Sequence, residues 1–74
     1  MTILIDGRVL QPPEPLERTL RALETLPDDE ELILLVGCHP EPLLFILEDS
    51  GYGWRETVHA DGTHELVIRK ATDG

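Results

Sequence analysis

Residues 31–37 read Glu-Leu-Ile-Leu-Leu-Val-Gly, and this stretch carries the strongest strand signal in the chain. Its unbroken apolar run, closed by Gly37, predicts a short buried strand. Proline and glycine divide the sequence on either side of it into compact elements. The fold can therefore be predicted by working outward from this strand.

A helix is predicted immediately before it. Proline is tolerated in a first helical turn, where its missing N–H would be unpaired, so the Pro-rich segment 11–15 marks the start. Pro27 marks the end, because the residue before a proline disfavours the helical conformation. Apolar residues at helical spacing predict one buried stripe. The stripe consists of Leu16, Leu20, Leu23 and Leu26.

Residues 2–6 are predicted to form another strand. Its Ile-Leu-Ile run is apolar on both sides of the pleat, which favours a strand that is covered on both faces or central in the sheet. The order strand, helix, strand predicts a right-handed crossover that leaves the two strands parallel.

After Gly37, a second helix is predicted from Pro40 to Gly51. Its residues 43–47 are all apolar, so the helix is expected to be well buried or to cover a partner. The last third of the chain predicts a hairpin, with strands 52–59 and 64–70 around Asp61-Gly62.

The register of this hairpin decides which side chains share a face. A two-residue loop would set Thr57 opposite Leu66, which matches a polar side chain with an apolar one. A three-residue loop over 61–63 sets Val58 opposite Leu66 and pairs more apolar surface, so it is preferred. It sends His59 and His64 to opposite faces. Trp54, Glu56, Ile68 and Lys70 then lie on one face.

The order β-α-β-α-β-β predicts an α+β two-layer sandwich, with both helices on one face of a four-stranded mixed sheet, and one domain over residues 1–74. Helices on one face cannot cover every apolar side chain of strands 3–5 and 32–36. A homodimer through the uncovered sheet face is therefore one expectation.

Charge and composition exclude several classes of function. Six basic and fifteen acidic residues give a formal charge of −9, which repels nucleic acid and anionic membranes. The N-terminal residues do not predict a signal peptide, and no stretch reaches the length of a membrane span. With Cys38 as the single cysteine, these features predict a cytoplasmic protein.

Residues 5–15, Ile-Asp-Gly-Arg-Val-Leu-Gln-Pro-Pro-Glu-Pro, resemble the TusA-like (SirA-like) sulfur-carrier superfamily. Its members open with a strand, Asp-x-Arg-Gly-Leu, and then Cys-Pro-x-Pro at a helix start. Val9 replaces the glycine of this pattern, and Pro12 stands where the family has its cysteine. The residues that fit are Asp6, Arg8, Leu10, Pro13 and Pro15.

The substitution at Pro12 separates the fold that the resemblance implies from the activity. TusA-like carriers hold sulfur as a persulfide on the missing thiol, at a helix N-terminus that favours the thiolate. Proline has no sulfur, so the carrier role does not transfer to this position. The chain more closely resembles the cysteine-less branch of the superfamily, which consists of small domains of unknown function.

The predicted topology gathers several polar and proline residues along one rim. The first two strands end there, both helices begin there, and the hairpin turn (59–64) returns there, so a ligand or partner site is expected at this rim by analogy with open α/β sheets. Glu14 is expected to interact with the helix dipole. The predicted rim residues are Arg8, Pro12, Pro13, Glu14, Pro15, Cys38, His39 and Pro40.

Three functions are consistent with these residues. The leading hypothesis is a non-enzymatic accessory or binding module for a protein or small ligand, with no catalytic residue and no cofactor. The alternative is sulfur transfer or redox chemistry at Cys38, assisted by His39. The third is a metal- or haem-binding module that uses His39, His59 or His64, with Cys38 as a further suitable ligand.

Overall fold

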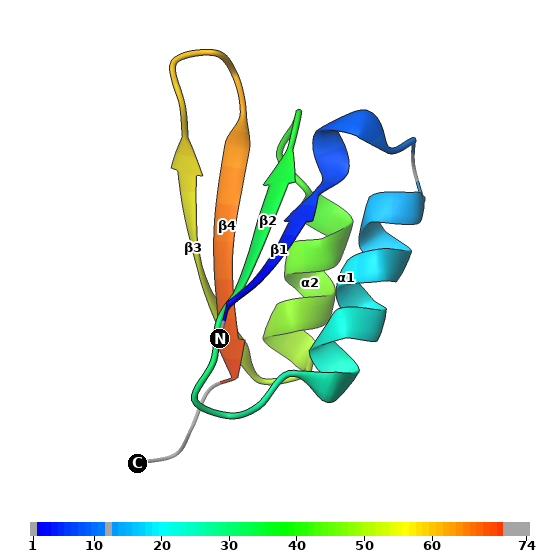
Figure 1. Ribbon diagram of the computed structural model, residues 1–74, viewed down its shortest axis with the longest axis vertical. Helices are drawn as coiled ribbons and strands as arrows, with labels where there is room; N and C mark the ends of the chain where they lie inside the picture. The colour runs from blue at the N-terminus through cyan, green and yellow to red at the C-terminus, as the bar shows by residue number, and fades with distance from the viewer. Residues whose placement is uncertain (1, 12, 71–74) are drawn as a thin grey trace.

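The computed structural model describes residues 2–11 and 13–70, and the chain forms two layers. Figure 1 shows both helices on one face of a sheet, which confirms the predicted α+β sandwich. The elements are β1 (Ile3–Asp6), a 3-10 turn η1 (Gly7–Val9), α1 (Glu14–Thr25), β2 (Leu32–Val36), α2 (Glu41–Asp49), β3 (Tyr52–Val58) and β4 (His64–Lys70).

The sheet has the strand order β1-β2-β4-β3, with β1 parallel to β2 and the other neighbours antiparallel. The mixed sheet and the parallel β1–β2 pair are as predicted. The prediction that the first strand is central or covered on both faces is wrong, because β1 lies at an edge and Leu4 is 63% exposed. Strand β4 takes the other side of β2, where Leu34 pairs with Leu66 and both are buried.

The hairpin confirms the predicted faces but not the predicted pairs. Val58 pairs with His64 and not with Leu66, so the loop is 60–62 instead of 61–63. Gly62 explains the difference: its φ of 90° suits the last position of a three-residue loop, which requires a left-handed residue. The shift is two residues, so each side chain keeps its face.

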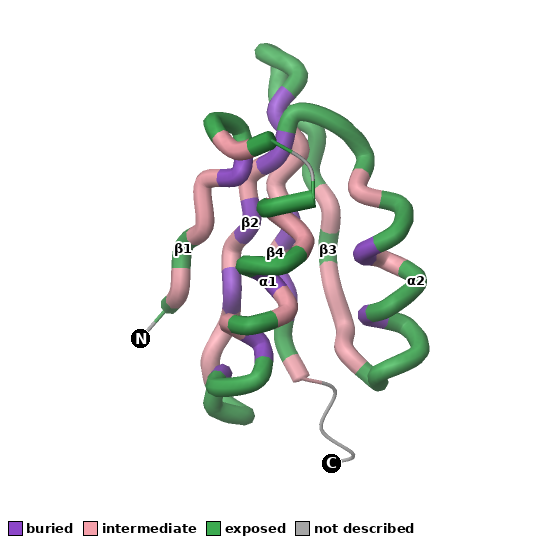
Figure 2. The backbone as a smooth tube through the Cα atoms, turned by 90° about the vertical axis from the view of Figure 1, so that its right-hand side faces the viewer, coloured by how far each residue is buried: buried purple, intermediate pink, exposed green. Residues whose placement is uncertain are grey.

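The core lies between the sheet and the helices. Figure 2 shows the buried residues on the strands and on the helix sides that face them. On α2 the apolar residues divide: Leu43 and Leu47 are buried, whereas Phe45 is 65% exposed and Ile46 is also exposed. The core residues are Leu23, Leu26, Leu32, Leu34, Val36, Leu43, Leu47, Leu66 and Ile68.

The opposite face of the sheet is not covered by the described part of the chain. Leu4 pairs with Ile33 and Ile33 with Val67, so these three side chains form an apolar row on that face. This confirms that the helices cannot cover all the apolar strand residues. Within residues 2–11 and 13–70, no helix is long and apolar enough to cross a membrane.

Candidate functional site at the helix-start rim

The rim predicted from the sequence exists as one edge of the molecule. In Figure 1 the ends of β1 and β2, the starts of both helices and the β3–β4 turn all lie at the upper end of the fold. Two features occupy this edge on the helix side: an apolar cavity and a cluster of two histidines with a glutamate.

The apolar cavity, called here the rim cavity, lies between the starts of α1 and α2 and has a volume of about 320 Å³. Its walls combine proline rings, which hold the backbone rigid, with aliphatic side chains from the core. Cys38 and His39 are the residues on its wall that carry a thiol or a ring nitrogen. The full lining is Pro13, Pro15, Leu16, Leu34, Val36, Cys38, His39, Pro40, Pro42 and Leu43.

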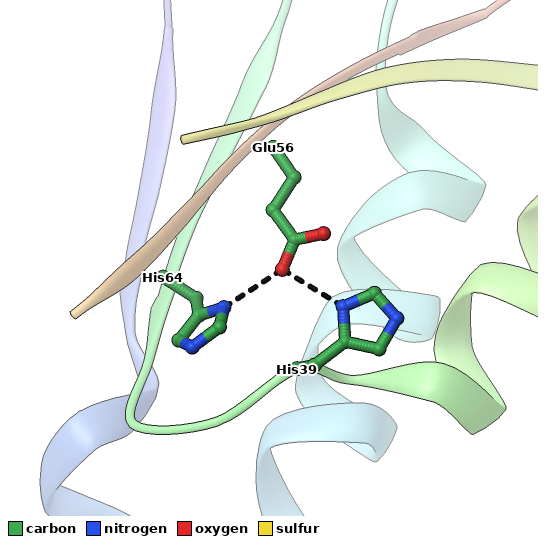
Figure 3. A group of neighbouring side chains, drawn as sticks. All are labelled: His39, Glu56 and His64. Carbon is green, nitrogen blue, oxygen red and sulfur yellow. Dashed lines mark hydrogen bonds and ion pairs between the residues drawn. The ribbon is translucent and has the colours of Figure 1, made fainter. Parts of the chain in front are cut away.

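The cluster consists of His39, Glu56 and His64, and Figure 3 shows both imidazole rings turned toward the same carboxylate. The Nδ1 atom of His39 lies 2.9 Å from Glu56 Oε2, and the Nδ1 atom of His64 lies 2.8 Å from the same oxygen. The glutamate and His64 side chains are each 19% exposed, whereas His39 is 52% exposed.

Three separate elements bring this cluster together. His39 lies in the loop between β2 and α2, Glu56 lies on β3, and His64 is the first residue of β4. Glu56 is directed to the helix side because it pairs with the buried Leu66 across the hairpin. His64 shares this face because the side chains of a strand alternate and Leu66 is two residues further on.

Electrostatics explain which atoms carry the protons. The hydrogen bonds from His39 and then His64 lower the pKa of Glu56 below its ordinary value of 4.5, although its burial acts in the opposite direction. The ionised carboxylate can only accept hydrogen bonds, so both Nδ1 atoms must be the donors. The cluster is therefore an anionic oxygen held between two N–H groups.

Five of the eight residues predicted for the rim lie together in the structure. Pro13, Pro15, Cys38, His39 and Pro40 all line the rim cavity. Pro12 lies outside the described residues.

The remaining predicted residues lie elsewhere. Arg8 binds Asp6 through two side-chain contacts of 2.9 and 2.8 Å, and lines a separate hollow together with His59. Glu14 forms an exposed ion pair with Arg18 at 3.1 Å.

The histidines proposed as metal ligands are also separated. His39 and His64 meet at Glu56, but His59 lies on the other face of the hairpin, where its Nε2 is 2.7 Å from Glu65 Oε1. Glu56 was not among the predicted site residues. The sequence does contain a signal for Glu56. It is the single carboxylate on a strand face that also carries the apolar Trp54 and Ile68, and a charged side chain in such a position needs a polar partner.

Comparison with known proteins defines the class to which this fold belongs. A crystal structure of a SirA-like protein from Desulfitobacterium hafniense matches 97% of this chain and 100% of its own, with a TM-score of 0.82 and 24% sequence identity. The chain therefore has the fold of the small SirA-like, or TusA-like, domains. Residues 4–70 match the family of uncharacterized conserved proteins called DUF2249, and the chain belongs to that family. Among curated proteins, no sequence matches this chain.

Proposed function

We propose that this chain is a non-enzymatic binding module that accepts a small apolar group of a ligand or partner in the rim cavity. The observation that carries the proposal is the cavity itself, whose walls are proline rings and aliphatic side chains at the start of both helices. Binding pockets for small molecules are concave, mostly apolar and largely preformed. The proline rings hold the backbone of the pocket rigid before a ligand arrives. Little conformational freedom is therefore lost on binding, which favours affinity.

Size and charge narrow the ligand class. Pockets for drug-sized ligands start at about 300 Å³, so a cavity of about 320 Å³ suits a small group and not an extended cofactor. The formal charge of −9 disfavours an anionic ligand. We therefore expect the occupant to be a neutral or cationic molecule, or a side chain with an apolar end.

Cys38 has a role in this proposal as part of the wall. The sulfur-transfer alternative needs a base or cation beside the thiol, and in His39 this would have to be the Nε2 atom, because Nδ1 is bonded to Glu56. The same thiol gives a chemical means of blocking the cavity, because Cys38 is exposed at its wall.

The test is titration of the chain with Nile red, a neutral dye whose fluorescence rises in apolar surroundings. Alkylation of Cys38 with N-ethylmaleimide and the substitution Leu16→Gln each change the cavity lining. Each should weaken dye binding by about tenfold, which corresponds to about 1.4 kcal/mol of binding free energy. Amide chemical shifts should move mainly around residues 13–16 and 36–43.

The matched control is Phe45→Gln, which removes an exposed apolar side chain that does not line the cavity. It should leave the affinity unchanged if the dye enters the cavity. Dye binding that depends on Phe45 and is insensitive to both cavity changes would contradict the proposal. Cys38→Ser separates the two hypotheses for the thiol, since a binding module should keep its affinity without any sulfur at this position.

A further inference from the structure

The cluster of His39, Glu56 and His64 has a set of donor atoms that the rim cavity does not use. One atom from each residue can be chosen so that all three lie within 4.8 Å of one another. Two imidazole nitrogens and a carboxylate oxygen are ligand types that zinc and related divalent transition ions prefer. Within the described residues, this group alone has the composition and the spacing of a metal site.

We propose that His39, Glu56 and His64 bind a divalent transition-metal ion of the zinc type, with Nδ1 of each histidine and the carboxylate of Glu56 as ligands. The inference goes beyond the proposed apolar binding, because it uses different atoms. His39 is the one residue that belongs to both the cluster and the wall of the rim cavity.

The geometry needs little change to admit an ion. Zinc–nitrogen and zinc–oxygen bonds of about 2.0–2.2 Å in a tetrahedral site place the ligand atoms about 3.3 Å apart. The two nitrogen–oxygen distances in the cluster are 2.9 and 2.8 Å. Each contact must therefore open by about 0.5 Å for an ion with tetrahedral geometry. Each ring then binds as a neutral imidazole, with its proton on Nε2.

The supports of the three ligands differ in a way that suits metal uptake. Glu56 and His64 lie on adjacent antiparallel strands, so the sheet holds two ligands in place before any ion arrives. His39 lies in a loop and is 52% exposed, so it can move to complete the site. Because the side chain of His39 is exposed while those of Glu56 and His64 are mostly covered, an ion can reach the site from the His39 side.

The charge of the protein and the number of ligands predict the character of the site. A formal charge of −9 raises the local concentration of cations near the surface. Three protein ligands leave at least one coordination position for water or an external donor, as in zinc sites that are not purely structural. The site should therefore bind an ion reversibly and should also bind small donors such as azide or imidazole through that ion.

His59 and Glu65 provide an internal control for this proposal. Their side chains also form a histidine–carboxylate contact, at 2.7 Å, on the opposite face of the same hairpin. The side chains of this pair are 47% and 31% exposed, more than those of Glu56 and His64, and the pair lacks a second imidazole. A site that depends on three converging ligands should be lost when the cluster is changed and kept when this pair is changed.

The experiment uses the full chain without a histidine tag, freed of metal by a chelator and titrated with Zn²⁺ by calorimetry and with Co²⁺ by visible absorption. We expect one ion per chain and the absorption bands of four- or five-coordinate Co²⁺, without the ultraviolet band of a thiolate–cobalt bond. Mutating a residue that only hydrogen-bonds a metal ligand typically lowers metal affinity by about 10–100-fold. Loss of a ligand itself should cost no less, so Glu56→Gln and His39→Gln should each lower the metal affinity by at least about tenfold.

The control is His59→Gln, on the opposite face of the hairpin, which should keep the metal affinity within about twofold. Circular dichroism and Nile red titration of each variant show whether the fold and the rim cavity remain. In Glu56→Gln, whose side chain does not line the rim cavity, an unaltered dye affinity together with a lost metal affinity separates this inference from the proposed function. Absence of binding at micromolar Zn²⁺, or equal loss in His59→Gln and Glu56→Gln, would overturn the proposal and leave the cluster as a hydrogen-bonded structural contact.

Discussion

Among the glycines in the described part of the chain, Gly7 is the most closely surrounded; it begins η1, between the end of β1 and the start of α1. A Cβ atom there would lie 3.0 Å from the carbonyl oxygen of Leu35, 3.1 Å from Pro15 Cβ and 3.1 Å from Val36 Cγ1. Pro15 and Val36 line the rim cavity, so any displacement would reach the candidate site. The φ angle of Gly7 is not positive, so the cost of Gly7→Ala comes from these contacts and not from the backbone conformation.

The size of the effect follows from two opposing terms. Inserting a methyl group into a packed position costs about 1–3 kcal/mol, and the upper part of that range applies when the neighbours are backbone or a proline ring. Replacing glycine by alanine also lowers the entropy of the unfolded chain, which returns about 0.4–1 kcal/mol. The net loss in the free energy of unfolding should be about 1–2 kcal/mol, which lowers the melting temperature by roughly 4–16 °C.

The assay is urea unfolding followed by the fluorescence of Trp54, the single tryptophan of the chain. The matched control is Gly37→Ala, because a Cβ at Gly37 meets nothing within 4 Å and its φ is not positive. That variant should be as stable as the parent or more stable by about 0.4–1 kcal/mol. If Gly7→Ala unfolds at the same urea concentration as Gly37→Ala, the steric argument at the rim is refuted.

Two further predictions concern the core and the acid stability. Leu47 is fully buried, so Leu47→Ala should cost about 2–5 kcal/mol in urea unfolding. Phe45→Ala on the exposed side of the same helix should stay within about 0.5 kcal/mol, and equal losses would contradict the assigned helix face. Hydrogen bonds from the Arg8 side chain and then its backbone N–H lower the pKa of Asp6 from 3.8 to about 2. The ionised form is thus favoured by folding, and the stabilisation is present above pH 3.8 and lost as the pH falls through about 2. The melting temperatures of wild type and Asp6→Asn should converge over that interval, and a constant difference would exclude this linkage.

Features that depend on neighbouring residues were predictable from the sequence. The apolar spacing of α1 identified the side that carries the buried Leu23, and the buried Leu26 follows directly after the helix; this was predictable because a helical period repeats within a few residues. The alternation of the hairpin strands placed His59 and His64 on opposite faces for the same reason. The predicted order of elements also gathered Pro13, Pro15 and residues 38–40 at one edge of the sheet, where they line the rim cavity.

Position within the sheet and the composition of the cluster depended on the tertiary structure. Both predicted parallel strands are apolar, and only the pairing of β4 with β2 placed β1 at the edge. Gly62 set the hairpin register through its left-handed φ, two residues away from the predicted pairing. The contacts of Glu56 span 17 residues to His39 and 8 to His64. Sequence periodicity reports which face a side chain takes, but it carries no information on which distant side chain shares that face. The contact of both histidines with one carboxylate therefore became visible only in the tertiary structure.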